Sequence, residues 1–293
     1  MLIDVHTHTP RRKAPPPPGE EQREMKRRPD KVTSNLHTRD DYLSAMAPVQ
    51  KAIVFNIAAD PRAPMEDKPD RLQYATPNVN DDTADFVRAH PDKLIGFLTV
   101  HPHDSHAIDE MNRCVQELGL KGVKLGPNYQ NFDPLGDEAF AIYRRAEELG
   151  LPILFHQGTS PERFADLDYA HPRHMDRVAM AFPDLRIIMA HIGHPWQVDC
   201  CCVIRKHPNV YADISAQFYR PWSYYNAMRL ATEWGVLDKL LFGSDFPVAT
   251  PQETLDALAC VNDAITGTKL PAVPVEEVMK IAERDSLALL GVT

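Results

Sequence analysis

The 293-residue sequence lacks several features that mark particular classes of protein. It has no apolar run approaching the roughly 20 residues that cross a bilayer, and no basic N-terminal region followed by an apolar signal core. Its five cysteines include no CxxC spacing, which argues against a zinc knuckle or a disulfide framework. No Gly-x-Gly-x-x-Gly motif follows an early apolar segment, which weakens a dinucleotide-binding interpretation. These absences predict a cytoplasmic protein with reduced cysteines.

Positive charge is also in short supply. The chain has 32 Lys and Arg against 41 Asp and Glu, for a net charge of −9. Binding to nucleic acid generally needs a basic surface that displaces the counterions of phosphate. We therefore expect a small-molecule substrate, no nucleic-acid partner and no membrane partner. A homodimer is an additional expectation, because many barrels of the kind predicted below form pairs.

What the chain does contain is a recurring short apolar segment rich in Val, Ile and Leu. There are eight: 2–5, 52–56, 94–100, 122–125, 152–155, 186–190, 210–214 and 240–242. Near-continuous apolar runs are typical of strands buried on both faces of a parallel sheet. Between them, Ile108, Met111 and Val115 have the spacing of one helix face. The alternation predicts a single α/β domain over residues 1–293, a closed (β/α)8 TIM barrel in preference to an open doubly wound sheet.

One connection departs from this regular pattern. Residues 10–37 follow the first apolar segment and contain "APPPPGEEQREMKRRPDK". Four successive prolines favour an extended polyproline conformation, and this length is unusual for a connection inside a barrel. Residues 11–31 contain eight Lys or Arg against four Asp or Glu. The segment is predicted to be an elaborated loop, either merely solvated or forming a basic rim that attracts an anionic substrate.

Candidate metal ligands stand where the apolar segments end. In a barrel, the loops at the carboxyl ends of the strands carry the active site. "DVHTH" directs His6 and His8 to one side of a strand, because side chains alternate across it. "LPILFHQGT", "RIIMAHIGH" and "LLFGSDFP" bring His156, His191 and Asp245 to the same level. Imidazole with one carboxylate suits Zn²⁺, and also Mn²⁺, Fe²⁺ or Co²⁺, so we expect one divalent metal ion here.

The order of motifs along the chain resembles that of a known family. The motifs are "DVHTH", "GVKLGPNYQNFDP", "HQGT", "AHIGHPW", "NVYADIS" and "FGSDFP". Over most of its length the sequence is similar to the amidohydrolase superfamily, in particular the amidohydrolase-related group that contains aminocarboxymuconate semialdehyde decarboxylase. The resemblance implies that His6, His8, His156 and Asp245 bind the metal, with Zn²⁺ as the first expectation. It also implies that His191 stands beside the metal-bound water as a catalytic residue.

Lys124, in the motif "GVKL", has three interpretations. Some amidohydrolases carry a carboxylated lysine on the fourth strand that bridges two metals, although members with this pattern look mononuclear. A basic group beside the cavity could instead bind a substrate carboxylate or carbonyl oxygen, or Lys124 could be purely structural. Substrate recognition is expected from loop residues at the same end of the barrel. The candidates are Lys124, Tyr129, His101, Trp196 and Arg220.

Three functions are consistent with this set of residues. The first expectation is a metal-dependent hydrolase of a small anionic substrate, namely a carboxylated compound, a lactone or a thioester. There Asp245 would accept a proton from a metal-activated water, and His191 would orient that water or stabilise the oxyanion. The alternative is a metal-dependent, non-oxidative decarboxylase of an aromatic or muconate-like acid, using the same residues. The third is a barrel that binds metal without turnover.

Overall fold

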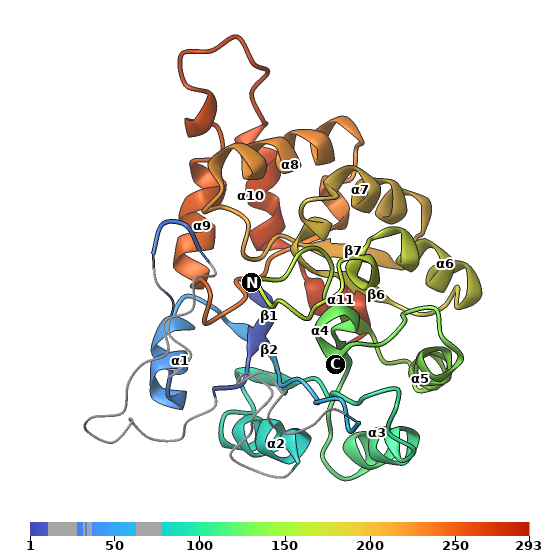
Figure 1. The fold of residues 1–293 in the computed structure, drawn as a ribbon. Helices are drawn as coiled ribbons and strands as arrows, with labels where there is room; N and C mark the ends of the chain where they lie inside the picture. The colour runs from blue at the N-terminus through green and yellow to red at the C-terminus, as the bar shows by residue number, and fades with distance from the viewer. Residues whose placement is uncertain (11–27, 32, 34–36, 63–77, 293) are drawn as a thin grey trace.

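In the computed structural model, parallel strands form a central barrel and helices surround it (Figure 1). The structure describes residues 1–10, 28–31, 33, 37–62 and 78–292. The strands of this part of the chain are β1 Ile3–His8, β2 Lys51–Phe55, β3 Leu94–Gly96, β4 Val123–Leu125, β5 Ile153–Phe155, β6 Ile187–Met189, β7 Val210–Asp213 and β8 Leu240–Leu241. Each of them overlaps one of the eight predicted apolar segments.

Helices follow the strands along the chain and surround the barrel. They are α1 Arg39–Ala45, α2 Val79–Ala89, α3 Ala107–Gln116, α4 Pro127–Gln130, α5 Asp137–Glu148, α6 Arg173–Ala181, α7 Gln197–Lys206, α8 Pro221–Glu233, α9 Pro251–Ala259, α10 Val275–Glu283 and α11 Ser286–Leu290. The predicted face on α3 is confirmed, since Met111 is buried while Ile108 and Val115 pack against the core. Helix α9 begins with a capping box, in which the side chains of Thr250 and Glu253 each accept a backbone N–H of the other.

The barrel closes through two short junctions. Strands β1 to β3 form one parallel sheet and β4 to β8 another. Leu98 bridges to Val123 and thereby joins the two sheets on one side. On the other side, Thr7 bridges to Phe246, and the Val5 N–H donates to the Phe242 carbonyl at 3.0 Å. The predicted closed (β/α)8 barrel is therefore confirmed.

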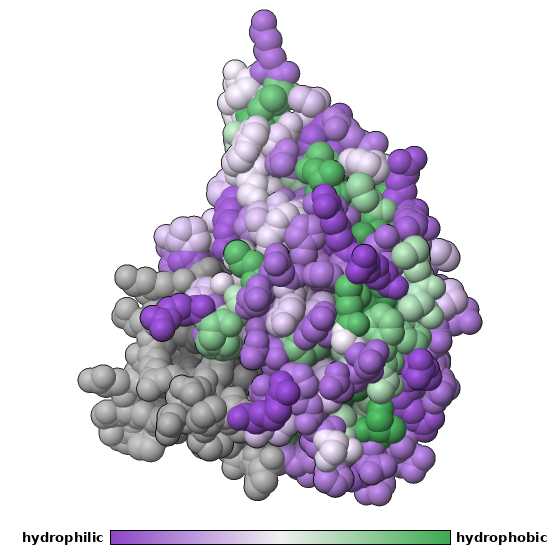
Figure 2. Space-filling model, turned by 45° about the vertical axis from the view of Figure 1, so that its right-hand side comes forward, coloured by the Kyte–Doolittle hydropathy of each residue, from purple (hydrophilic) through white to green (hydrophobic). Residues whose placement is uncertain are grey.

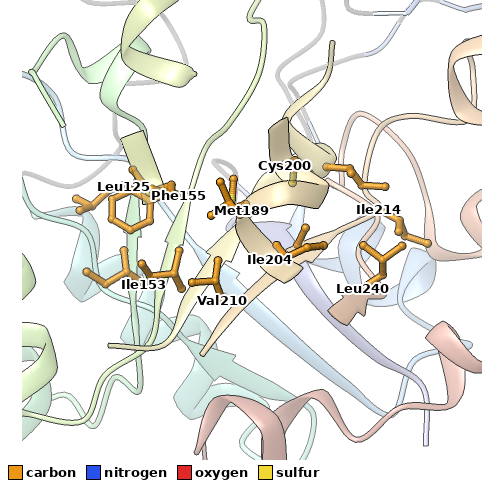
Figure 3. Packing of buried hydrophobic residues seen from close by; sticks show 14 of the residues in the cluster. Leu125, Ile153, Phe155, Met189, Cys200, Ile204, Val210, Ile214 and Leu240 are labelled. Atoms are coloured by element: carbon orange, nitrogen blue, oxygen red, sulfur yellow. The ribbon is translucent and has the colours of Figure 1, made fainter. Parts of the chain in front are cut away.

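Apolar side chains fill the barrel and the space around it. Inside the barrel, Val5, Phe55 and Leu154 belong to one buried cluster. A larger cluster lies between the strands and the helices, where Cys200 and Ile204 of α7 face the sheet (Figure 3). Cys200 is thus a packed apolar residue of this core. This rigid scaffold holds the strand ends, and with them the polar side chains, in fixed positions.

The predicted basic loop of residues 10–37 lies mostly outside the described residues. Its described end is anchored by Arg28, whose side chain is buried. The Arg28 guanidinium donates to the Val248 carbonyl at 3.2 Å, pairs with Glu253 at 3.1 Å and lies over the rings of Phe218 and Tyr219. This end of the segment therefore lies beside the loops that follow β7 and β8.

The surface is polar for the most part. Figure 2 shows hydrophilic side chains over most of the face that it presents, with hydrophobic groups in separate patches. The large exposed hydrophobic residues among those described are Met1, Phe164, Leu167, Met180, Val198, Trp222 and Leu270. None of the described helices combines the length and the apolar character that a membrane span requires.

Candidate metal centre and active site

Three of the four predicted metal ligands converge at the junction between β1 and the segment after β8. His6 and His8 are on β1, and the Asp245 N–H donates to the His6 carbonyl at 2.8 Å. Nε2 of His8 lies 3.1 Å from Oδ1 of Asp245, and Nε2 of His6 lies 3.4 Å from the same oxygen. These donor atoms all lie within 4.8 Å of one another, as ligands of a single ion would.

The position of the proton on the His6 ring makes the three donor atoms suited to a cation. Nδ1 of His6 lies 2.8 Å from Oδ2 of Asp213, a fully buried carboxylate that can only accept, so the proton is on Nδ1. In neutral His6 the lone pair is then on Nε2 and faces the Asp245 oxygen. Two lone pairs at 3.4 Å repel each other unless a cation lies between them. The donor set therefore fits a divalent metal ion.

The environment keeps His8 neutral and Asp245 ionised. Burial lowers the pKa of His8 to about 3, against an opposing hydrogen bond with Asp245, so the imidazole has a lone pair at neutral pH. Burial alone would raise the pKa of Asp245, but the hydrogen bond from His8 and the neighbouring His6 and His191 hold it well below its usual range. Neutral imidazole and ionised carboxylate are the forms that bind metal.

His156, the fourth predicted ligand, lines the same cavity but stands apart from the other three. It is buried beside the end of β5, and its ring centre lies 5.0 Å from that of His191 and 4.8 Å from that of Tyr129. It lines the same cavity as His6, His8 and Asp245, but its nitrogens are not within 4.8 Å of all three donor atoms. Its role as the fourth ligand remains a prediction.

A buried network of Asp213 and Ser215 orients His191. Oδ1 of Asp213 accepts from the backbone N–H of His191 at 3.0 Å and from the Ser215 hydroxyl at 2.5 Å. Nδ1 of His191 lies 3.1 Å from the Ser215 carbonyl and 2.9 Å from its hydroxyl oxygen. A carbonyl can only accept, so the His191 proton is on Nδ1 and the remaining nitrogen, Nε2, carries a lone pair. Burial lowers the pKa of His191, which favours this neutral form.

Both predicted catalytic residues have a left-handed backbone conformation. His191 has φ +59° in the short helix η4 Ala190–Gly193, and Asp245 has φ +63°. Residues other than glycine rarely adopt this left-handed backbone region, and each one that does costs on the order of 1–3 kcal/mol. The hydrogen bonds from the His191 N–H to Asp213 and from the Asp245 N–H to His6 hold both residues in place. Strain of this kind is typical of functional sites.

The site opens into a cavity of about 280 Å³, a size suited to a small molecule. Of the five predicted substrate-binding residues, Tyr129 and Arg220 line it. Lys124, His101 and Trp196 are not among its lining residues. The structure also shows lining residues that sequence reasoning had not named as substrate-binding, including His194 and Gln217.

The three predicted residues that do not line the cavity have other surroundings. Lys124 is in the middle of β4, fully buried, with Nζ 4.8 Å from the centre of the Phe55 ring. Its charge contributes to the lowered pKa of His8 and of His191, after the larger effect of burial. The ring of Trp196 packs on that of His171 at 4.8 Å.

His101 belongs to a second group of potential ligands, with Asp60 and His103. Both of its ring nitrogens are engaged, since Nε2 lies 2.6 Å from the Gln130 carbonyl and Nδ1 accepts from the His103 N–H at 3.1 Å. The guanidinium of Arg62 also contacts the His103 ring. A metal ion would have to displace these interactions, so this group is a poor metal site.

Asp213 and Ser215 are the residues that the sequence analysis missed. Both occur in the motif "NVYADIS", which carried part of the family resemblance but gave no role to either residue. Their significance depends on contacts across more than 200 positions to His6, which no local pattern reveals.

A closed barrel with His and Asp side chains that could hold a metal ion at its strand ends is the arrangement expected of an enzyme of the amidohydrolase type. A sequence model of the family described as Amidohydrolase matches residues 3–292. The chain belongs to this family.

Among curated proteins, a 129-residue stretch is 28% identical to 2-amino-3-carboxymuconate-6-semialdehyde decarboxylase of Dictyostelium discoideum. The match covers 44% of this chain and about a third (33%) of that relative's length. The family predicted from the sequence motifs is therefore confirmed.

Solved structures share the fold over most or all of the chain. A probable 2-pyrone-4,6-dicarboxylic acid hydrolase from Acinetobacter baumannii aligns with 15% identity and a TM-score of 0.62, covering 99% of each chain. A 2,6-dihydroxybenzoate decarboxylase from Rhizobium aligns with 18% identity and a TM-score of 0.64, covering 99% of this chain and 98% of that one. A manganese-bound 5-carboxyvanillate decarboxylase from Novosphingobium aromaticivorans aligns with 17% identity and a TM-score of 0.60, covering 86% and 80%. At these identities the likeness shows the fold.

Proposed function

We propose that this chain is a metal-dependent decarboxylase of a small aromatic or unsaturated acid. The observation that carries the proposal is the convergence of ring nitrogens of His6 and His8 and a carboxylate oxygen of Asp245 beside a neutral His191, in one small cavity. The sequence motifs favoured hydrolysis first. The curated relative and two of the three solved structures above are decarboxylases, and this supports decarboxylation better.

The residues of the site can be given roles in this reaction. A divalent ion held by His6, His8, His156 and Asp245 would act as a Lewis acid that stabilises negative charge on the substrate. When protonated, His191 would carry a proton at Nε2, because Nδ1 is held by Ser215. That proton would go to the carbon that CO₂ leaves. The electron pair of the broken carbon–carbon bond stays on this carbon, so a C–H bond replaces the carboxylate.

Hydrolysis is the second candidate, favoured by the equally complete structural likeness to the probable 2-pyrone-4,6-dicarboxylic acid hydrolase. In this reaction Asp245 would accept a proton from the attacking water and pass it to the leaving group. Its ionised state, with a pKa held well below the usual range, suits a proton acceptor. The two candidates use the same residues and differ in their products.

One experiment distinguishes them. Metal-replete protein is incubated with aromatic acids, lactones and thioesters while CO₂ and titratable acid are recorded together. CO₂ release that falls in His191→Asn, but not in the control His207→Asn outside the cavity, supports the decarboxylase. Acid without CO₂ selects the hydrolase. Neither product, at full metal occupancy, would leave a barrel that binds metal without turnover.

The identity of the metal is a separate proposal. Zn²⁺ is our first candidate, because two or three imidazoles with one carboxylate suit it well. Mn²⁺ is the second, because the structurally similar 5-carboxyvanillate decarboxylase binds manganese. Elemental analysis of protein purified without chelator, followed by reconstitution of stripped protein with each ion, identifies which metal restores activity.

A further inference from the structure

Arg220 is a cation of the cavity that no carboxylate among the described residues neutralises. It is half-buried at the start of α8, with its guanidinium 4.7 Å from the centre of the Tyr219 ring. Its hydrogen bond to the Ala216 carbonyl is long, at 3.4 Å. Arg28 lies over the same ring, also at 4.7 Å, but has Glu253 as an ion-pair partner at 3.1 Å. Of these two arginines, Arg220 is the one whose charge no carboxylate among the described residues balances.

His194 contributes a second donor to the same cavity. Its Nδ1 accepts from the Gln197 amide at 2.9 Å and lies 3.2 Å from the Ser223 hydroxyl. The proton of the neutral ring is therefore on Nε2, which leaves an N–H for a ligand. Burial, and next the charge of Arg220, lower the pKa of His194 to about 4, so the ring is neutral at pH 7. Because the ring is neutral, its Nε2–H offers a second hydrogen bond to an anion without repelling the Arg220 guanidinium.

The charges around the cavity are unevenly distributed. Among the described residues that line it, Asp245 is the acidic one, and its oxygen faces His6 and His8. The part formed by Arg220 and His194 thus presents donors and positive charge. A planar guanidinium fork matches a carboxylate in two parallel hydrogen bonds.

We propose that Arg220 and the Nε2–H of His194 form a carboxylate-binding subsite, which holds an acid group that the reaction leaves intact. The inference rests on the proposed function and sharpens it. The substrate carries a carboxylate besides the reacting group, so a decarboxylation substrate is at least a dicarboxylic acid. The product of the decarboxylation keeps this second carboxylate, which stays bound to Arg220.

The test uses benzoate as the probe and neutral benzamide as its matched control. Calorimetric titration of metal-replete protein gives the Kd of each. Loss of a charged hydrogen-bond partner predicts that Arg220→Gln weakens benzoate binding by about tenfold to a hundredfold. The Kd of benzamide should change by less than about twofold in the same variant. Arg220→Lys, which keeps the charge without the fork, should fall between the two. Thermal unfolding of each variant checks that the fold is retained.

Two further variants locate the probe. His194→Gln keeps a donor near the position of Nε2 and should bind benzoate more tightly than His194→Leu, which has none. His8→Ala weakens the metal centre but should leave benzoate binding within about threefold, a change of less than 0.7 kcal/mol. Benzoate binding that depends on His8 and not on Arg220 would overturn the proposal, because the probe would then sit on the metal.

The kind of anion that binds the subsite and the proposed function of the protein are tested separately. Inorganic phosphate that binds through Arg220 more tightly than benzoate would overturn the assignment of a carboxylate. The titrations need no turnover, so they are independent of CO₂ release. Benzoate binding that depends on Arg220, in a protein that releases no CO₂ from any dicarboxylate, would retain the subsite and refute the decarboxylase.

Discussion

Asp213→Asn is the substitution with the most informative consequence for the metal centre. The carboxylate accepts four hydrogen bonds: Oδ2 accepts from Nδ1 of His6 at 2.8 Å, and Oδ1 accepts from the His191 N–H, the Ser215 N–H and the Ser215 hydroxyl. An asparagine oxygen can take the place of Oδ1 and keep three of them. The amide nitrogen then takes the place of Oδ2 and meets His6 as a donor.

Two donors cannot pair, so the His6 proton must move from Nδ1 to Nε2. The lone pair that faces Asp245 is then lost. We expect metal affinity to fall by about tenfold to a hundredfold, the usual cost of removing the carboxylate behind a metal-bound histidine. Loss of one charged hydrogen bond should also lower the free energy of unfolding by about 1.5–3 kcal/mol.

Competition with a chromophoric chelator measures the metal affinity, and ¹⁵N NMR of the histidine rings reports the tautomer. Asp176→Asn is a matched control, because Asp176 also accepts from a histidine, His207 at 2.7 Å, but lies at the surface on α6. It should leave metal affinity unchanged. Wild-type metal affinity in Asp213→Asn, with the His6 proton still on Nδ1, would refute this reasoning.

Other consequences of the structure can be measured in the same way. His191→Asn should leave metal content intact and lower the rate by about a hundredfold or more, a typical acid–base contribution; substantial loss of metal would instead make His191 a ligand. Gly158→Ala should destabilise the protein by more than about 3 kcal/mol in denaturant titrations, because a Cβ at φ +91° would lie 2.2 Å from the His194 carbonyl oxygen; a smaller effect would mean that this loop relaxes easily. Glu110→Gln tests acid stability: burial opposes ionisation, but hydrogen bonds from Arg113 and Asn80 lower the Glu110 pKa from 4.5 to about 2. The ionised Glu110 carboxylate contributes about 1–2 kcal/mol to the free energy of unfolding, after allowance for partial exposure. This contribution is complete above pH 4.5 and disappears as the pH falls through 2, so the stabilities of wild type and variant should converge in acid. A difference in stability that persists at pH 2 would contradict this.

The sequence alone predicted the barrel because buried parallel strands leave a strong apolar signal. All eight strands overlap predicted segments, since apolar runs of this kind need burial on both faces. The convergence of His6, His8 and Asp245 was also predictable, because the ends of neighbouring strands meet at one level of a barrel.

The direction of individual side chains was harder to predict. The end of an apolar segment fixes the level of a residue in the barrel, but not which side chain reaches the cavity. Lys124 is inside β4 and lies over Phe55, while Trp196 turns towards His171. The role of Asp213 depends on its contact with His6, on a strand far away in the sequence. Such contacts are properties of the folded chain and leave no local pattern.

We propose above all that His6, His8 and Asp245 hold one metal ion. The most direct test is a crystal structure of protein loaded with Zn²⁺ or Mn²⁺, with anomalous scattering recorded at the absorption edge of the metal. We predict one strong peak about 2.0–2.2 Å from Nε2 of His6, Nε2 of His8 and an oxygen of Asp245. A peak at Asp60, His101 and His103 instead, or none in the cavity, would contradict the account.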